Sequence, residues 1–139
     1  MKAVFVDTNV IVDLLADRPP FSKYAIELFA LAEKGKVRLY TSSHSIATVH
    51  YLLKKYRKEK DLRAILYTLM DFIEAIAIDT PILKKSLLSQ HKDFEDALQI
   101  HAALSNPQID YIVTRNLKDF KTAELPVYAP DEVLVRLDK

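Results

Sequence analysis

The fold is decided by residues 3–9, which read Ala3-Val4-Phe5-Val6-Asp7-Thr8-Asn9. The first four residues are apolar and rich in β-branched and aromatic side chains, which predicts a strand that is buried on both faces. Such strands occur mainly in parallel sheets covered by helices, and helical periodicity dominates the rest of the chain. The sequence therefore predicts an α/β layered fold that begins with this strand.

Helices and short strands are predicted to alternate along the rest of the chain. Helices are expected over residues 10–16, 22–35, 43–56, 61–72, 81–89 and 93–105, and from residue 130 onward. Strands are expected at 37–40, 75–78, 111–113 and 126–128. Gly35, the only glycine, is predicted to end its helix in the left-handed conformation. The triplet at 51–53 is expected to form the apolar centre of its helix.

Composition excludes several classes of protein. With 139 residues, of which 50% are hydrophobic and 28% charged, the chain is expected to form one soluble globular domain spanning residues 1–139. The absence of cysteine excludes disulfides and thiolate metal sites. A net charge of +1 means that any affinity for nucleic acid must come from local clusters of charge. The apolar run before Asp7 is too short for a signal peptide or membrane span, so we expect a cytoplasmic location and no contact with membranes.

Polar clusters follow two of the predicted strands. Asp7-Thr8-Asn9 follows the first strand, and Thr114-Arg115-Asn116 follows the strand at 111–113. In an open parallel sheet, ligands bind beyond the carboxyl ends of the strands. Asp96 opens a helix that lies between these strands in sequence. We therefore expect Asp7, Asp96 and the 116–119 region to converge on one cleft.

Carboxylates that lie this close repel one another unless a cation neutralises them. Oxygen ligands without cysteine point to Mg²⁺ or Mn²⁺, which keep several bound waters and commonly meet substrate phosphates. The four histidines are not spaced like zinc ligands, so we interpret them as surface or packing residues. Metal-assisted hydrolysis of phosphodiester bonds is the reaction that such a site suits.

Each of these acids also has a purely structural interpretation. Asp7 could cap the helix that follows it, and Asp96 could complete a capping box at the third position of its helix. Asp93 and Glu95 are interpreted as a helix cap and a first-turn acid that the helix dipole favours. The 116–119 segment could simply cap a short turn.

Three ordered motifs resemble those of PIN-domain proteins: residues 6–13 (VDTNVIVD), 93–99 (DFEDALQ) and 113–120 (VTRNLKDF). The resemblance implies a Rossmann-like α/β/α sandwich with a central parallel sheet of four to five strands. It also implies an Mg²⁺- or Mn²⁺-dependent endoribonuclease of the VapC type, the toxin of a type II toxin–antitoxin pair. Homodimers and a small antitoxin partner are implied with it.

The resemblance also assigns roles to individual residues. By analogy with the family, Asp7 is the first metal-binding acid and Asp96 the third, whereas the fourth falls at Asn116 or Asp119. Thr114 is expected to donate a hydrogen bond to metal-bound water or to phosphate. Asn9 is expected to orient Asp7.

The sequence departs from the family pattern at one position. The family usually carries an acid in the helix after the second strand, but residues 42–52 contain none, and the equivalent position is Thr48. Threonine offers only a neutral oxygen, so we expect weaker affinity for a divalent cation. His44, one turn earlier on the same helical face, could donate a hydrogen bond to a phosphate.

Basic residues gather in two places. Arg115 and Lys118 lie beside the predicted cleft and are expected to contact RNA phosphates, with a strength that falls as salt rises. The basic residues within 54–63 are interpreted as a solvated junction between two helices.

Two alternative functions follow from the same residues. Because Thr48 removes one acid, the chain could be a catalytically weakened PIN module that binds RNA or a protein partner without cutting. The same acids could also serve a phosphatase or a flap-type DNA nuclease.

Overall fold

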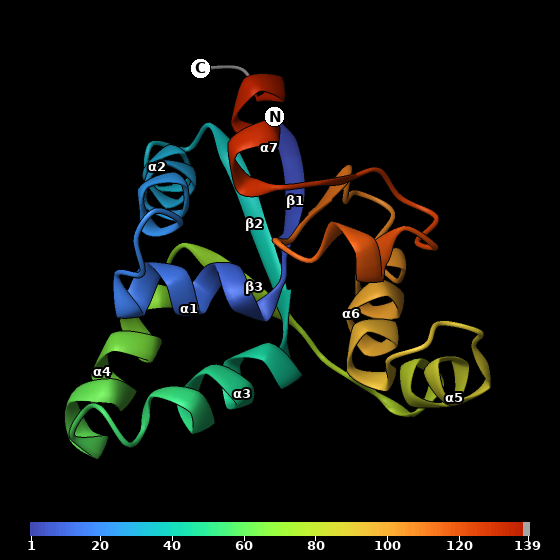
Figure 1. Ribbon diagram of the computed structural model, residues 1–139, viewed down its shortest axis with the longest axis horizontal. Helices are drawn as coiled ribbons and strands as arrows, with labels where there is room; N and C mark the ends of the chain where they lie inside the picture. Colours follow the sequence, from blue (N-terminus) through green and yellow to red (C-terminus); the bar gives the residue numbers. More distant parts are fainter. Residues whose placement is uncertain (138–139) are drawn as a thin grey trace.

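A five-stranded parallel sheet forms the centre of the computed structural model, which describes residues 1–137 (Figure 1). The strands lie in the order β3-β2-β1-β4-β5, and every neighbouring pair is parallel. Their bounds are β1 Lys2–Val6, β2 Val37–Ser42, β3 Ile73–Ile76, β4 Tyr111–Val113 and β5 Val127–Tyr128. The predicted α/β fold with a parallel sheet is confirmed.

Helices cover the sheet and fill the chain between the strands. Their bounds are α1 Thr8–Ala16, α2 Ser22–Glu33, α3 Ser43–Leu53, α4 Glu59–Leu69, α5 Thr80–Leu88, α6 Phe94–Leu104 and α7 Pro130–Arg136, with a short 3₁₀ helix, η1, at Leu117–Phe120. Figure 1 shows α1 to α4 on one side of the sheet, and α5 and α6 on the other. No helix among the described residues is long and apolar enough to cross a membrane.

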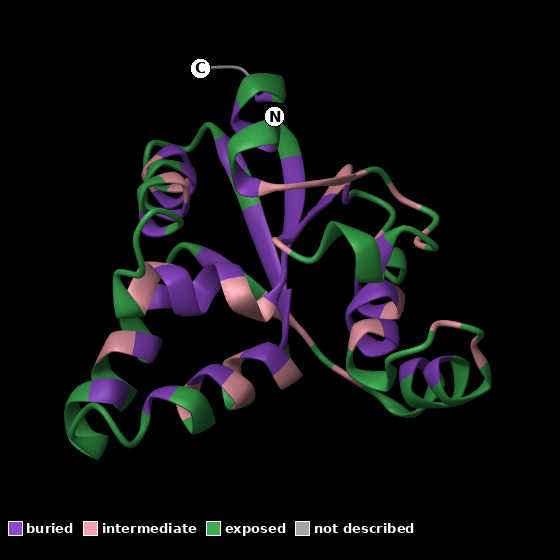
Figure 2. Ribbon diagram, viewed as in Figure 1, coloured by how far each residue is buried: buried purple, intermediate pink, exposed green. Residues whose placement is uncertain are grey.

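Strand β1 separates two hydrophobic cores because successive side chains of a strand point to opposite faces. Val4 and Val6 pack in a cluster with apolar residues of α1, α2, α4 and α7. Ala3 and Phe5 pack in a second cluster with residues of α6 and with Phe120. These four residues of β1 are buried, and Figure 2 shows most of the strand in the colour of buried residues. Residues 3–6 are all apolar because β1 is covered by side chains on both faces of the sheet.

Helix ends follow side-chain caps where the sequence offers them. Ser42 caps α3 by accepting from the backbone N–H of Ser45, and Asp79 caps α5 in the same way. Gly35 adopts φ +72° after α2, and the backbone N–H of Lys36 donates to the carbonyl of Leu31 at 2.9 Å. This is the left-handed helix end that the sequence predicts for Gly35.

Three predictions about local structure are wrong. The third strand lies at Ile73–Ile76, two residues before its predicted place, because residues 77–79 leave the sheet to reach the start of α5. Helix α3 ends at Leu53. Of the predicted apolar centre at 51–53, only Leu53 is buried, whereas Tyr51 is 64% exposed. Three successive residues of a helix span more than half a turn, so they cannot all face one core.

Candidate active site

Asp7 lies where β1 ends and α1 begins. Its backbone N–H donates to the carbonyl of Val113 at 2.9 Å, which holds it beside the end of β4. One carboxylate oxygen, Oδ1, accepts the backbone N–H of Thr8 at 2.8 Å, so Asp7 does cap α1. The residue is only 6% exposed. Asp7 therefore caps α1 and also lies at the carboxyl end of the central strand, where a ligand would bind.

Two side chains from distant segments hold the Asp7 carboxylate. Gln99 donates from Nε2 to Oδ1 at 3.0 Å, and Thr114 donates from Oγ1 to Oδ2 at 2.8 Å. Burial raises the pKa of Asp7, because it penalises the charged form more than the hydrogen bonds from Gln99, Thr114 and Thr8 favour it. A cation in front of this carboxylate would relieve the penalty.

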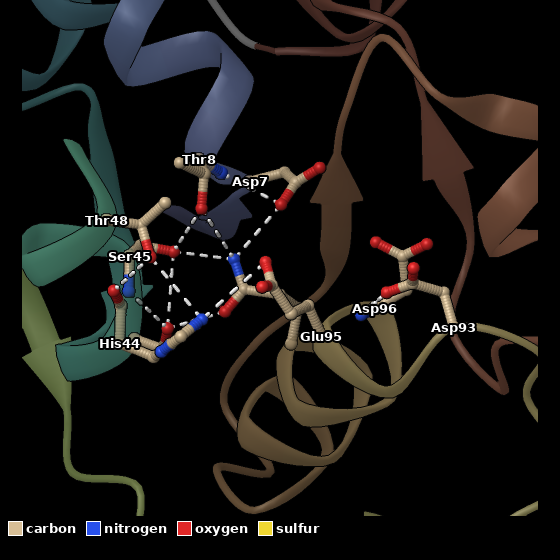
Figure 3. Close-up of polar contacts among 10 residues, drawn as sticks. Asp7, Thr8, His44, Ser45, Thr48, Asp93, Glu95 and Asp96 are labelled. Carbon is tan, nitrogen blue, oxygen red and sulfur yellow. Dashed lines mark hydrogen bonds and ion pairs between the residues drawn. The ribbon is translucent and has the colours of Figure 1, made fainter. Parts of the chain in front are cut away.

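Gln99 was given no role by the sequence analysis, yet it organises the polar interior. It is 2% exposed, and besides Asp7 it donates to Ser45 Oγ at 2.6 Å. It also accepts a hydrogen bond from Ser42, and Figure 3 shows the network between Asp7, Thr8 and Ser45. The available signal was an amide within the apolar run at 97–103, which needs a buried hydrogen-bonding partner.

Asp96 lies in the first turn of α6, after Asp93 at the helix N-cap. Asp93 accepts the backbone N–H of Asp96 at 3.0 Å, which confirms Asp93 as a cap. The pKa of Asp96 is raised from 3.8 to about 7, first by partial burial and then by repulsion from Asp93, Asp7, Asp119 and Glu95. This repulsion shows that the acids from three separate motifs lie close enough to interact.

A cleft of about 410 Å³ lies between these elements. Its lining residues are Asp7, Thr8, Asn9, Val12, Arg18, His44, Thr48, Tyr51, Leu52, Glu95, Asp96, Gln99 and Asn116. The structure therefore brings Asp7, Asp96 and Asn116 to one cleft. Asp119 is exposed on η1, outside this lining, and acts on Asp96 through its charge.

Thr114 and Asn9 are arranged differently from the prediction. The Thr114 hydroxyl is fully buried and donates to Asp7, rather than into the cleft. Among residues 1–137, Asn9 forms no hydrogen bond with Asp7; its Nδ2 donates to Thr114 Oγ1 at 3.4 Å. The Asn116 backbone N–H also donates to Thr114 Oγ1, at 3.0 Å. Asn9 thus supports Asp7 indirectly, through Thr114.

Arg115 is part of an ion-pair network within the fold. Its Nε donates to Asp13 Oδ2 at 2.6 Å, and its guanidinium lies 4.0 Å from the centre of the Phe21 ring. Arg18 pairs with the other oxygen of Asp13 at 3.0 Å. Asp13 is 1% exposed on α1 and was given no role by the sequence. Of the two predicted phosphate contacts, Lys118 is exposed to solvent, whereas Arg115 is occupied by Asp13.

The α3 side of the cleft carries Thr48 and His44. Thr48 Oγ1 donates to the backbone carbonyl of His44 at 2.9 Å and lies 3.4 Å from His44 Nε2. The same ring nitrogen, His44 Nε2, lies 3.7 Å from Glu95 Oε2. Glu95 therefore reaches across the cleft from α6, as Figure 3 shows, although the sequence interpretation made it only a first-turn acid.

The donor set fits a hard divalent cation. Asp7 and Asp96 offer carboxylate oxygens to the same cleft, and Asn116 adds a neutral oxygen. Within residues 1–137, no group of three or more histidine, aspartate or glutamate side chains is arranged to hold an ion by itself. Mg²⁺ commonly binds through one or two carboxylates and keeps several waters, so a cleft lined by two aspartates meets this requirement.

The chain is similar to known proteins in both sequence and fold. The PIN-domain family profile matches residues 3–118. Ribonuclease VapC1 of Aquifex aeolicus (strain VF5) is 31% identical over 140 residues, which cover 97% of this chain and 95% of that protein.

Solved structures share the fold. A toxin–antitoxin complex from Klebsiella pneumoniae matches with a TM-score of 0.64 and 25% identity, over 91% of this chain and 97% of the other. VapBC2 from Rickettsia felis, bound to a DNA fragment from its promoter, matches with a TM-score of 0.63 and 21% identity, over 91% and 98%.

Proposed function

Because the chain belongs to the PIN-domain family, we propose that it is a metal-dependent endoribonuclease formed by a single domain. The observation that carries the proposal is the meeting of Asp7 and Asp96 in one cleft at the carboxyl ends of the strands. The relative named as a ribonuclease supports RNA as the substrate class. The reaction proposed is hydrolysis of a phosphodiester bond within RNA.

In this proposal Asp7 and Asp96 hold the cation, with Asp119 or Asn116 as the fourth group. Mg²⁺ or Mn²⁺, when bound, lowers the pKa of a bound water and neutralises charge on the phosphate. Both carboxylates must be ionised to act as ligands, and both have raised pKa values in the metal-free protein. Cation binding is therefore expected to release protons near neutral pH.

The chain's own residues keep the site in order. Gln99 and Thr114 fix the two oxygens of Asp7 from opposite sides, so the carboxylate cannot rotate freely. The Asp13–Arg115 pair anchors the segment that contains Thr114 and Asn116. Lys118 is the proposed contact to an RNA phosphate, and Arg115 positions the loop beside it.

We also propose that the protein is the toxin of a type II toxin–antitoxin pair that acts in the cytoplasm as a homodimer. The support is the set of structural relatives, which are toxin–antitoxin complexes. Co-expression with the product of the adjacent reading frame, followed by co-purification, tests the partner. Sedimentation equilibrium of the chain alone tests the dimer.

RNA cleavage tests the proposed enzyme directly. The highly purified protein is expected to cut single-stranded RNA with Mg²⁺ or Mn²⁺, and EDTA is expected to stop the reaction. Asp7→Asn and Asp96→Asn should each lower the cleavage rate at least about 100-fold, since each removes a charged ligand. Asp71→Asn, the same change at an exposed acid before β3, is the matched control. Cleavage at the parent rate by either site variant would overturn the assignment.

Thr48 favours one alternative, a catalytically weakened module that binds RNA without cutting. In that case the parent protein binds RNA with Mn²⁺ present and leaves it intact at all protein concentrations. DNA flaps and phosphate esters, included in the same substrate panel, test the remaining nuclease and phosphatase alternatives.

A further inference from the structure

One side of the cleft lacks a charge that the other side can supply. On α3, the cleft is lined by the neutral Thr48, at the position where the family resemblance of the sequence implies an acid. Facing it across the cleft, the first turn of α6 carries Glu95 next to Asp96. Glu95 and Thr48 both line the cleft that contains Asp7.

His44 connects the two sides. Its Nε2 lies 3.4 Å from Thr48 Oγ1 and 3.7 Å from Glu95 Oε2. One nitrogen of this ring therefore lies near both the neutral residue and the carboxylate, and the Glu95 side chain extends toward the α3 side (Figure 3). The contact of 3.7 Å is too long for a strong hydrogen bond, so Glu95 retains freedom to move.

We propose that Glu95, guided by His44, supplies the carboxylate that position 48 lacks and helps to hold the divalent cation. The inference rests on the proposed metal-dependent function and assigns it a further residue. The side chain of Glu95 is 67% exposed, so it can turn toward the cation without disturbing packing. The short Thr48 side chain leaves space for that movement in the cleft.

The ordinary role of a first-turn acid does not explain this placement. An acid near a helix N-terminus is favoured by the helix dipole, whichever way its side chain points. Glu95 instead lies against a side chain of another helix and lines the cleft. Its charge also acts on both Asp7 and Asp96, since it contributes to the raised pKa of each. A third negative charge at this point is costly without a cation.

Calorimetric titration with Mn²⁺ tests the inference without any assay of activity. Glu95→Gln keeps the size of the side chain and removes its charge, so we expect about tenfold weaker Mn²⁺ binding. Glu74→Gln makes the same change at an exposed acid on β3 and is expected to leave the affinity unchanged. Thermal unfolding in EDTA serves as the fold control, and Glu95→Gln should unfold at or above the parent temperature because it removes a repelling charge.

A charge swap provides the decisive variant. Thr48→Glu in the Glu95→Gln background returns a carboxylate to the α3 side, so Mn²⁺ affinity should return to within about threefold of the parent value. Failure of the swap to improve on Glu95→Gln would overturn the inference.

The outcomes also separate this inference from the proposed function. If the parent binds Mn²⁺ and cuts RNA, and Glu95→Gln binds Mn²⁺ equally well, the role of Glu95 is wrong and the proposed function stands. If the parent neither binds Mn²⁺ nor cuts RNA, the proposed function fails, and the role of Glu95 fails with it.

Discussion

The carboxylate of Asp7 serves as a helix cap, as an acceptor for two distant side chains and as a wall of the cleft. These roles compete energetically, because burial raises the pKa of Asp7 and thus disfavours the ionised form needed for metal binding. Three hydrogen bonds compensate only in part. Functional sites commonly contain such buried charged groups, which reduce stability but are needed for reactivity.

The raised pKa of Asp96 predicts a pH dependence of stability. Its pKa rises from 3.8 in the unfolded chain to about 7 in the folded, metal-free protein. The folded state therefore binds more protons between these values, so stability is lost as pH rises through them. The free energy of unfolding should therefore fall between pH 5 and pH 8. After allowance for solvent screening, Asp96→Asn should make this fall smaller by about 1 kcal/mol. Urea unfolding in EDTA at both pH values measures the free energy of unfolding of the parent and the variant. The same difference between the two pH values in both proteins would contradict the prediction.

Gln99 offers a second prediction at the level of one side chain. Gln99→Leu keeps the approximate volume but leaves Asp7, Ser42 and Ser45 without their shared partner. Buried polar groups without partners should lower the free energy of unfolding by about 2 kcal/mol. Gln108→Leu, at an exposed glutamine, is the control and should change stability little. Equal urea midpoints for the two variants would show that the network contributes nothing to stability.

At the scale of elements, Asp13 joins α1 to the segment that follows β4. Arg115 donates to both oxygens of this carboxylate, and Arg18 donates to one of them, Oδ1, although the two arginines come from distant parts of the chain. Because Thr114 precedes Arg115, this pair also fixes the segment that holds Asp7. The Asp13–Arg115 pair between α1 and the segment after β4 therefore helps to position Asp7.

Asp13→Asn is expected to lower the free energy of unfolding by about 3 kcal/mol, since it leaves a partly buried guanidinium without its charge partner. Arg18→Gln removes a partner that is 47% exposed and should cost less than about 1 kcal/mol. Guanidinium-chloride unfolding of both variants measures the difference. A similar loss for both would place the stabilising interaction at Arg18 and not at Arg115.

Element ends were predictable where a side chain caps the helix and less so elsewhere. Helices α3, α5 and α6 begin directly after the capping residues Ser42, Asp79 and Asp93. Helix α4 has no side-chain cap at its start, and it begins and ends two or three residues before the predicted bounds. A cap fixes a boundary through one local hydrogen bond, whereas an uncapped end depends on packing.

At the scale of the molecule, the net charge of +1 means that RNA binding must depend on where the basic residues lie. Lys118 lies on η1, in the segment that follows β4, two residues after Asn116, which lines the cleft. The basic residues within 54–63 lie at the junction of α3 and α4, where Arg63 pairs with Glu59. Lys118 is therefore the basic residue whose removal we expect to affect RNA binding.

Salt dependence measures this contribution. The affinity of EDTA-treated protein for single-stranded RNA is measured by fluorescence anisotropy at KCl concentrations from about 50 to about 200 mM. These measurements give the slope of log affinity against log salt concentration. Lys118→Ala should reduce the slope by about 0.7, the value for one phosphate contact to a single strand. Lys36→Ala, at the amino end of β2, should leave it unchanged. An unchanged slope for Lys118→Ala would remove Lys118 from the interface.

The sequence by itself determined the buried strand at 3–6, the capped helices and the order of the three motifs. These features depend on neighbouring residues: on apolar runs, on side chains that cap nearby N–H groups, and on the left-handed preference of Gly35. Asp7, Asp96 and Asn116 could be named because the ends of parallel strands lie at one edge of a sheet.

Only the tertiary structure decided which polar side chains meet. Thr114 and Asp7 are 107 positions apart, Arg115 and Asp13 are 102, and Gln99 and Asp7 are 92. Water satisfies each of these groups in the unfolded chain, so nothing local selects the partner. The partners are selected when packing of the helices on the sheet excludes that water. For this reason the sequence predicted Arg115 as a phosphate contact and Glu95 as a helix-end acid, whereas the fold places one on Asp13 and the other beside His44.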